Sequence, residues 1–301
     1  MKKILCIIGQ LGCGGSEKQL FLFLKNLDKT AWKPFVIVGS AVYQNSSYHK
    51  KIAEMKIPIF YLNGARSLKI LTYILLISRI RPQKIISWSF YMNAFHAFSF
   101  GIDFIGGMRG SLEVARNELS TANFAKSLSV KKIIVNSSEL ENQLLSEGKK
   151  QENIFFVPNI FEKKYSLMQE QDFLAIRKFL RTKLGIREND VIIAGAGRYT
   201  PEKDFHFFLD VVERIIPIFP SVKILLIGQC VIFFEPIINN KNIKDRFILM
   251  GETDNVHDLL PATDIFFLSS KSEGMPNILL EAIDAGCIPV ATNLGGVRDI
   301  L

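Results

Sequence analysis

The chain has 301 residues, of which 48% are hydrophobic and 22% are charged, so it is long enough for two globular domains and too apolar for a disordered protein. Its net charge of +8 is uneven, because residues 1–150 hold 21 Lys and Arg against 9 Asp and Glu, whereas residues 151–301 hold 16 against 20. The four cysteines form no C-x-x-C pair and have no histidine at metal-ligand spacing, which excludes the common zinc motifs and fits a reducing cytosol.

The basic first half favours an anionic partner, either nucleic acid or an acidic membrane surface. A solvated basic surface that only keeps the protein soluble explains the charge equally well. No RNA-binding or helix-turn-helix motif accompanies the charge, so we do not expect nucleic acid as a partner.

Short apolar runs alternate with amphipathic, helix-like segments along the whole chain. The runs predicted as strands are 3–8, 34–39, 57–62, 84–89, 103–108, 132–137, 154–158, 190–197, 222–228, 246–251, 264–270 and 288–292. The segments predicted as helices are 16–27, 67–80, 166–184, 204–216, 231–240, 254–261 and 276–285. This alternation predicts an α/β fold with parallel sheets covered on both faces.

Residues 85–102 have no formal charge over almost a membrane-spanning length. Serine, asparagine and histidine interrupt the segment, so we expect a buried strand followed by a buried helix. The strand-helix pattern restarts after a polar stretch near residue 166, which predicts two doubly wound domains, 1–165 and 166–301. The chain ends at Leu301 soon after a strand, and we expect the second domain to be incomplete there.

A glycine-rich turn, "GQLGCGGSEKQ", follows the first strand. Gly14 and Gly15 would let the backbone approach a ligand, and a helix capped by Ser16 would offer free N–H groups to an anion. The spacing matches neither the dinucleotide fingerprint nor the P-loop. A tight turn without a ligand remains the alternative.

The second domain opens with a comparable turn, "GAGRYTPEKDF" (195–205). Arg198 and Lys203 leave the end of a strand five residues apart, so both cations can converge on a diphosphate. The alternative is a solvated loop in which they pair with Glu202 and Asp204. The turn alone does not separate these interpretations.

The segment "SEGMPNILLEAIDAG" (272–286) predicts a loop that leads into a helix, with Pro276 at the first helical position and Gly286 at the stop. Asn277, Glu281 and Asp284 fall on one polar stripe of that helix. Glu281 would then face the carboxyl ends of the strands, where a carboxylate suits the hydroxyls of a ribose.

The loop before this helix carries two further expectations. Glu273 would hold the hydroxyls of a second sugar, and the backbone N–H groups of Gly274, Met275, Pro276 and Asn277, proline excepted, would be aimed at phosphate. The alternative is that Glu273 is a solvated acid and that Glu281 pairs with a neighbouring cation.

These motifs together resemble the retaining glycosyltransferases of family 4, which have the GT-B fold of two facing Rossmann-like domains. "GCGGSEKQ" is similar to that family's N-terminal glycine segment, "GRYTPEKDF" to its phosphate-binding turn, and "EGMPNILLEAIDAG" to its E-x7-E signature. "NIFFVPNI" resembles the end of its first domain, and "CIPVATNLGG" the segment after the signature. Relatives continue beyond the position of Leu301 through a further strand and a terminal helix.

The resemblance implies roles for particular residues. Arg198, Lys203 and Glu273 would be catalytic: the two cations would bind the donor diphosphate, and Glu273 would hold the donor sugar. Gly14, Gly15, residues 274–277 and Glu281 would bind the donor, with Glu281 on its ribose. On the acceptor side, Arg109 is favoured over His96, because a histidine among phenylalanines is more often part of a core.

The resemblance further implies an acceptor-binding first domain and a second domain that binds the nucleotide sugar. The expected reaction moves a hexose or N-acetylhexosamine, UDP-linked, to a glycan or lipid-linked glycan in surface polysaccharide synthesis, without a metal or other cofactor. The expected location is the cytoplasm, with peripheral contact between the basic first domain and an anionic membrane. The alternatives are an inactive sugar-nucleotide-binding protein and a sugar-nucleotide epimerase of the same fold.

Overall fold

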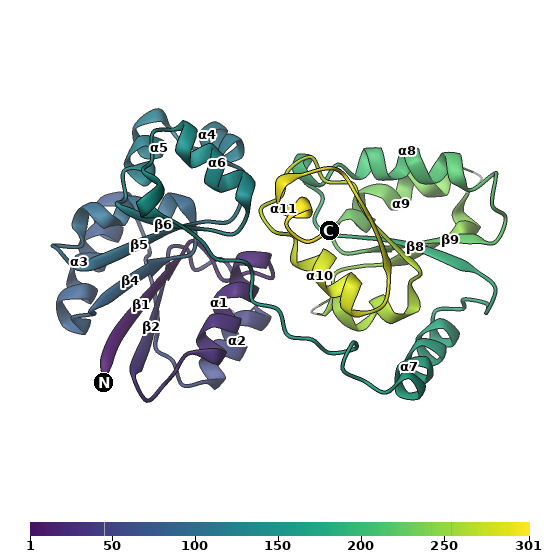
Figure 1. The fold of residues 1–301 in the computed structure, drawn as a ribbon, viewed down its shortest axis with the longest axis horizontal. Helices are drawn as coiled ribbons and strands as arrows, with labels where there is room; N and C mark the ends of the chain where they lie inside the picture. Colours follow the sequence, from purple (N-terminus) through teal and green to yellow (C-terminus); the bar gives the residue numbers. More distant parts are fainter. Residues whose placement is uncertain (45, 242, 254) are drawn as a thin grey trace. The chain divides into compact units, whose positions relative to one another are not determined.

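The computed structural model of the chain describes residues 1–44, 46–241, 243–253 and 255–301. They form two compact units, Met1–Ile160 and Phe161–Leu301. The boundary lies five residues before the expected end of the first domain at residue 165. Each unit is an α/β domain built on one all-parallel sheet (Figure 1).

The first unit has seven strands in the order β3-β2-β1-β4-β5-β6-β7. Their bounds are β1 Lys2–Ile8, β2 Trp32–Val38, β3 Ile59–Tyr61, β4 Lys84–Ser87, β5 Asp103–Met108, β6 Lys132–Val135 and β7 Ile154–Phe156. The helices are α1 Gly15–Asn26, α2 Ser47–Glu54, α3 Arg66–Ile80, α4 Leu112–Glu118, α5 Thr121–Leu128 and α6 Ser138–Ser146, with 3-10 helices η1 Phe90–Phe98 and η2 Gln151–Asn153.

Alternate side chains of β1 pack into two separate hydrophobic cores. Leu5 and Ile7 pack with α3, η1, α5 and α6 on one face, while Cys6 and Ile8 pack with α1 and α2 on the other (Figure 1). The strands read as continuous apolar runs because both faces of a parallel sheet are buried.

The second unit has five strands in the order β10-β9-β8-β11-β12. Their bounds are β8 Val191–Ala196, β9 Val222–Ile227, β10 Phe247–Met250, β11 Ile265–Leu268 and β12 Ile288–Ala291. The helices are α7 Glu170–Lys183, α8 Phe205–Ile215, α9 Cys230–Asn240, α10 Asn277–Asp284 and α11 Gly295–Arg298, with 3-10 helices η3 Pro201–Lys203, η4 Lys244–Arg246, η5 Val256–Asp258 and η6 Leu260–Ala262.

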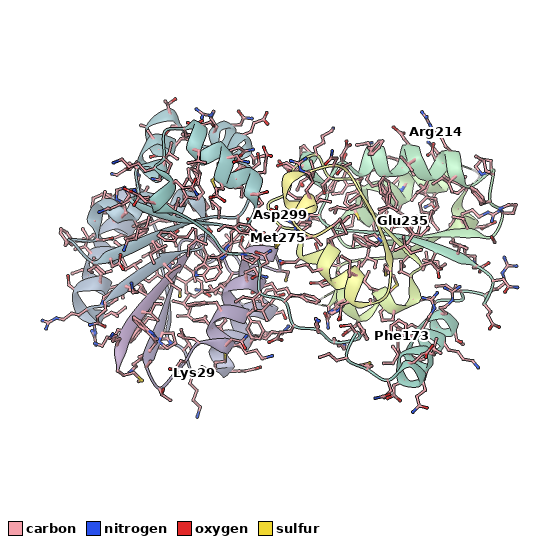
Figure 2. All side chains as sticks on the ribbon, viewed as in Figure 1. Lys29, Phe173, Arg214, Glu235, Met275 and Asp299 are labelled. Carbon is pink, nitrogen blue, oxygen red and sulfur yellow. The ribbon has the colours of Figure 1, made fainter. Side chains whose placement is uncertain are left out.

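Two helical layers cover the second sheet as well. The core that contains α8 and α9 lies on one face, and the core that contains α7, α10 and α11 lies on the other (Figure 1). Figure 2 shows how densely side chains fill the space between these layers.

Every strand expected from the sequence is present, with ends shifted by at most two residues. The helix expected over 254–261 is instead the two short 3-10 helices η5 and η6, and residue 254 itself lies outside the described residues. The charge-free stretch 85–102 forms part of β4 and the 3-10 helix η1, but η1 is only partly buried, with Phe90, Met92 and Asn93 inside and Tyr91 exposed. None of the helices in the described part of the chain combines the length and apolar character needed to cross a membrane.

Buried Asp284 anchors the beginning of the second unit. Its carboxylate accepts hydrogen bonds from the backbone N–H groups of Lys164 (2.9 Å), Tyr165 (3.0 Å) and Ser166 (3.2 Å), and from the Ser166 hydroxyl (2.7 Å). His257 Nε2 lies 3.1 Å from the same group. Burial raises the pKa of Asp284, but these hydrogen bonds outweigh burial and hold the pKa below its ordinary value.

We expect Asp284→Asn to lower the free energy of unfolding of the second unit by about 3 kcal/mol at neutral pH, because buried donors lose a charged acceptor. A carboxyl whose pKa is depressed in the folded state stabilises above its unfolded pKa of about 4 and loses that contribution as the pH falls through the folded pKa. The native chain should therefore lose stability on acidification, and Asp284→Asn should lose less. Calorimetric unfolding between neutral pH and acid measures both effects.

The exposed Asp210 on α8 offers a matched control, Asp210→Asn. It should leave both the neutral stability and its acid dependence close to those of the native chain. An Asp284→Asn variant with native stability and native acid dependence would contradict the anchoring role.

Candidate functional site

Each sheet reverses its strand order beside its own first strand. In the first unit β1 lies between β2 and β4, and in the second unit β8 lies between β9 and β11. Connections that leave such a pair run to opposite faces, so they open a crevice at the carboxyl ends of the strands. The motifs singled out in the sequence follow β1, β8 and β11, and therefore lie at these two positions.

In the second unit, this topology brings Lys203 and Glu273 together although 70 residues separate them. Lys203 Nζ lies 2.5 Å from Glu273 Oε1, and the same oxygen accepts a hydrogen bond of 2.7 Å from the Ser270 hydroxyl. Both side chains are largely buried, with 24% and 13% exposed. The alternative interpretation, in which Lys203 pairs with Glu202 or Asp204, therefore does not describe the partner that Lys203 has.

The two loops are joined along their backbones as well. Ser269 Oγ donates to the carbonyl oxygen of Lys203 (2.9 Å), and Lys271 N donates to the carbonyl oxygen of Glu202 (2.7 Å). Lys271 Nζ lies 3.0 Å from Asp204, which adopts a left-handed conformation and caps α8. These contacts fix the loop that carries Glu273 against the loop that carries Lys203.

A second backbone contact supports the loop from the other side. A Cβ atom on Gly296, in α11, would lie 1.2 Å from the carbonyl oxygen of Gly274. Gly296 is therefore required by close packing of α11 on the 274–277 segment, of which Gly274, Met275 and Pro276 are buried.

The helix α10 begins one residue later than expected, with Pro276 at its N-cap, and Gly286 follows its end with φ at 76° as the stop signal predicts. Its polar residues do not share one role. Glu281 is 7% exposed, whereas Asp284 is turned to the 164–166 segment and His257. Asp284 is therefore a structural residue, a role that the polar stripe in the sequence did not predict.

Arg198 follows the end of β8 and has an exposed side chain. Among the residues that the structure describes, this guanidinium forms no hydrogen bond or ion pair. It is thus the available cation of the site, beside a Lys203 that already has a carboxylate partner.

In the first unit, the glycine turn is held by a hydrogen bond to Glu17, which follows it in the sequence. Glu17, buried in the first turn of α1, accepts a hydrogen bond from Gly12 N (3.2 Å), and a Cβ on Gly14 would lie 2.6 Å from its other oxygen. The helix begins at Gly15 with Gly14 as its N-cap, so the expectation of Ser16 as the cap was wrong. The close approach of the Glu17 carboxylate therefore explains, from within the turn, why residue 14 has no side chain.

Arg109 follows β5 and stacks on Trp88, with the guanidinium carbon 4.4 Å from the ring centroid. Its Nη1 donates to Asn159 Oδ1 (3.0 Å), which also accepts from Asn136 (3.1 Å). Burial lowers the pKa of Arg109 to about 10. By contrast, His96 Nε2 lies 3.2 Å from the carbonyl oxygen of Lys126 and 3.0 Å from Ser129 Oγ, and burial lowers its pKa.

The described residues contain no group of three or more His, Cys, Asp or Glu side chains placed to hold a metal ion.

Comparison with known proteins matches residues 176–301 to the family described as "Glycosyl transferases group 1". The match lies within the second unit. The match covers β8, β11 and α10, and so includes Arg198, Lys203, Glu273 and Glu281.

Two curated relatives illustrate the likeness. N-acetyl-alpha-D-glucosaminyl L-malate synthase of Bacillus anthracis is 30% identical over 128 residues, which is 40% of this chain and 32% of that protein. The UDP-Gal:alpha-D-GlcNAc-diphosphoundecaprenol alpha-1,3-galactosyltransferase of Escherichia coli is 29% identical over 118 residues, or 38% and 30%. The chain therefore matches about a third of the length of these relatives.

The structural likeness extends over the whole chain. The crystal structure of Anabaena Alr3699/HepE in complex with UDP-glucose superposes with a TM-score of 0.81 at 18% identity, over 100% of this chain and 83% of that one. The fold is thus GT-B, built from two Rossmann-like domains, as the sequence resemblance predicted.

Sequence reasoning missed several residues at the turns of each unit. Ser269 and Ser270, at the end of β11, join the two loops. In the first unit, Tyr91 lies over the glycine turn, since a Cβ on Gly9 would lie 1.5 Å from its hydroxyl oxygen. No sequence motif marks these residues, because strand pairing alone brings them to the turns.

We expect Gly296→Ala to destabilise the second unit by about 1–3 kcal/mol, because the new methyl group overlaps the Gly274 carbonyl. Helix propensity alone predicts the opposite sign, since alanine is favoured over glycine within a helix. Calorimetric unfolding decides between the two. Gly251→Ala is the matched control, because a Cβ there meets no atom within 4 Å, and a Gly296→Ala variant as stable as that control would contradict the close packing.

Proposed function

We propose that the protein is a glycosyltransferase that moves a hexose or N-acetylhexosamine from a UDP-linked donor to a glycan or lipid-linked glycan in surface polysaccharide synthesis. The observation that carries the proposal is the Lys203–Glu273 pair at the strand-order reversal of the family-matched unit, with Arg198 in the turn that follows β8. Cations and a carboxylate at that position suit a diphosphate joined to a sugar. The relatives support the donor class, since one is named for UDP-Gal and a structural neighbour holds UDP-glucose.

The Lys203–Glu273 pair has a direct consequence for donor binding. Without a donor, Glu273 neutralises the cation that the diphosphate requires. A diphosphate would replace Glu273 as the partner of Lys203, which frees the carboxylate to accept hydrogen bonds from sugar hydroxyls. The exposed Arg198 would add a second cation through its planar fork.

The remaining donor contacts follow from the same edge of the sheet. Glu281 would hold the ribose hydroxyls, and the N–H groups at the start of α10, around residues 274–277, would face phosphate. From the first unit, the backbone at Gly14 and Gly15 would approach the diphosphate, and Arg109 would lie on the acceptor side.

The proposed chemistry rests on the leaving group. As the sugar–oxygen bond breaks, negative charge grows on the diphosphate, and Arg198 and Lys203 stabilise it in place of a metal ion. Positive charge develops on the sugar ring, which is oxocarbenium-like. The acceptor hydroxyl attacks from the same face and its proton passes to the departing diphosphate oxygen, so the anomeric configuration is retained. Positioning of the two substrates supplies the remaining rate enhancement.

We further propose that the first unit contacts an anionic membrane from the cytoplasmic side. Helix α3 exposes Leu68, Leu71 and Leu75, which are 51%, 52% and 61% accessible. The helix contains no acidic residue, and Arg66 and Arg79 lie near its two ends. An apolar stripe with basic flanks suits the boundary between headgroups and acyl chains.

For the donor site, we expect Lys203→Gln to weaken UDP binding about tenfold, because a charge-assisted contact to phosphate is lost. Glu273→Gln should instead tighten UDP about threefold, because no carboxylate then competes for Lys203. The same variant should abolish sugar transfer from UDP-glucose. Isothermal titration of UDP with EDTA present, followed by a transfer assay, measures all three effects.

Lys178→Gln on the exposed face of α7 removes the same charge from the second unit and should bind UDP like the native chain. If Lys203→Gln and Lys178→Gln weaken UDP binding equally, the effect comes from net charge and not from a contact made by Lys203. Loss of UDP binding on addition of EDTA would overturn the metal-independent mechanism.

For the membrane contact, we expect the double variant Leu71→Ser, Leu75→Ser to bind phosphatidylglycerol vesicles at least about tenfold more weakly, because two leucines no longer leave water. Vesicle flotation measures the loss. The control Leu174→Ser, Ile218→Ser removes equally exposed apolar side chains from the second unit, at 52% and 68% accessibility. Equal binding by both double variants would exclude α3 as the contact.

A further inference from the structure

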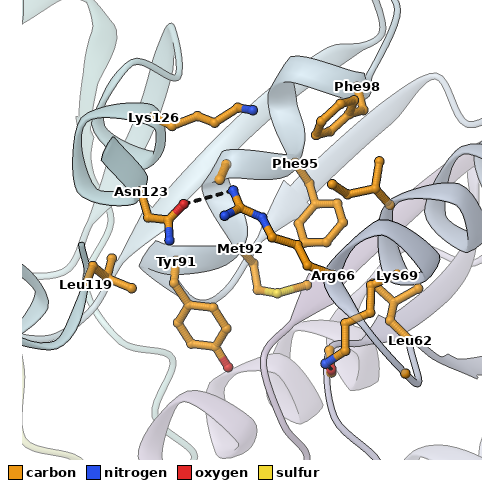
Figure 3. A pocket seen from close by; sticks show the side chains of 14 residues that line it. Leu62, Arg66, Lys69, Tyr91, Met92, Phe95, Phe98, Leu119, Asn123 and Lys126 are labelled. Carbon is orange, nitrogen blue, oxygen red and sulfur yellow. Dashed lines mark hydrogen bonds between the residues drawn. The ribbon is translucent and has the colours of Figure 1, made fainter. Parts of the chain in front are cut away.

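The first unit contains a cavity of about 370 Å³ that the donor site does not use (Figure 3). It lies at the carboxyl edge of the sheet, because its lining follows β2, β3, β4 and β5 in the chain. A volume of this size suits a small organic ligand. The lining residues are Gly39, Leu62, Gly64, Arg66, Lys69, Ile70, Tyr91, Met92, Ala94, Phe95, Phe98, Leu119, Asn123 and Lys126.

Three cations line this cavity, and the partners that the structure gives them are neutral. Arg66 Nη2 donates to Asn123 Oδ1 (2.8 Å), and Lys69 Nζ donates to the carbonyl oxygen of Gly39 (2.7 Å). Lys126 Nζ lies 4.7 Å from the ring centroid of Phe98. Figure 3 shows Arg66 reaching toward Asn123, with Lys126 and Lys69 on either side. No carboxylate of the described residues pairs with these three cations, in contrast to Lys203 in the second unit.

The rest of the lining is mostly apolar and aromatic. Met92 and Phe95 on η1 and Leu62 after β3 face the same space as the cations. Aromatic rings and a thioether contact a flat or aliphatic group well, while basic side chains above them bind an anion. A ligand that meets both parts is amphipathic and negatively charged.

Tyr91, which lines the cavity, is close enough to two carboxylates to be affected by their charge. Burial raises the pKa of Tyr91, and the carboxylates of Glu17 and Glu118 raise it further. Tyr91 also carries its hydroxyl toward Gly9 and the glycine turn. The cavity lining itself contains cations and no carboxylate, so the anionic end of a ligand would lie at Arg66, Lys69 and Lys126.

We propose that this cavity binds a phosphate monoester or diester joined to an apolar group. Arg66, Lys69 and Lys126 bind the phosphate oxygens, and Met92, Phe95 and Phe98 contact the apolar part. Phosphate suits a cavity lined by three cations better than a carboxylate does, because it offers oxygens in several directions. That this ligand is the acceptor rests on the proposed function, whereas its binding does not.

The first test uses phenyl phosphate, which joins a phosphate to an aromatic ring. Isothermal titration should show binding to the native chain, weaker binding of inorganic phosphate, and no binding of benzyl alcohol. The double variant Arg66→Gln, Lys126→Gln should bind phenyl phosphate at least about tenfold more weakly, since two charge-assisted contacts are lost. Native affinity in this variant would overturn the proposal.

The double variant Lys29→Gln, Lys131→Gln is the matched control, because it removes the same charge from exposed positions of the same unit. It should bind phenyl phosphate like the native chain. If it binds as weakly as the Arg66→Gln, Lys126→Gln variant, the effect comes from net charge and not from the cavity. The titration is repeated with saturating UDP, which should leave phenyl phosphate binding unchanged. Competition by UDP would place the phosphate in the donor site and refute the separate cavity, whereas a chain that binds phenyl phosphate without binding UDP would refute only the proposed donor site.

A second arm identifies the source of the phosphate. If the ligand is a membrane lipid, Lys69→Gln, Lys126→Gln should weaken flotation with phosphatidylglycerol vesicles at least about tenfold relative to the Lys29→Gln, Lys131→Gln control, and neither protein should float with phosphatidylcholine vesicles. If the ligand is a soluble phosphate ester, this variant should float like the control while losing phenyl phosphate. Unchanged behaviour in both assays would refute the site.

Discussion

The reversal of strand order beside β1 and beside β8 is the constraint on which the arrangement of these sites depends. Parallel strands need crossover connections, and these connections have one hand. When successive connections start from the same central strand and run in opposite directions, the loops after two neighbouring strands are left facing each other without a helix between them. The glycine turn and the Lys203 and Glu273 loops all occupy such places.

Within the second unit, backbone contacts make that crevice a defined structure. Ser269 reaches the backbone at Lys203, Lys271 reaches the backbone at Glu202, and Gly296 lets α11 pack on Gly274. Such contacts reduce the freedom of the loops before any ligand arrives, which lowers the entropic cost of binding. The Lys203–Glu273 pair is then held in one geometry, and its carboxylate and ammonium become mutually competing partners for a donor.

The two units treat their cations differently. In the second unit Lys203 is neutralised by Glu273, while in the first unit Arg66, Lys69 and Lys126 have neutral partners around an apolar floor. A cation with a neutral partner attracts an anion without first giving up an ion pair. Some of the excess basic residues in the first half of the sequence thus line a cavity, in which charged and apolar side chains lie together.

The sequence by itself determined the elements and their order, because strands buried on both faces of a parallel sheet must be continuous apolar runs. It was less informative for α2, α4, α5 and α6, although each begins after a serine whose hydroxyl accepts a backbone N–H three residues on: Ser46, Ser111, Ser120 and Ser137. The motifs also marked Arg198, Lys203, Glu273 and Glu281, since their residue types are those that phosphate and sugar hydroxyls require.

Only the tertiary structure decided which groups meet: that Glu273 faces Lys203, that Asp284 supports the unit instead of the site, and that Arg66 and Lys126 share a cavity. Some of these pairings join residues 60 or more positions apart, and others depend on which side of a helix faces a neighbour. Both are set by strand order and packing, which the local sequence does not contain.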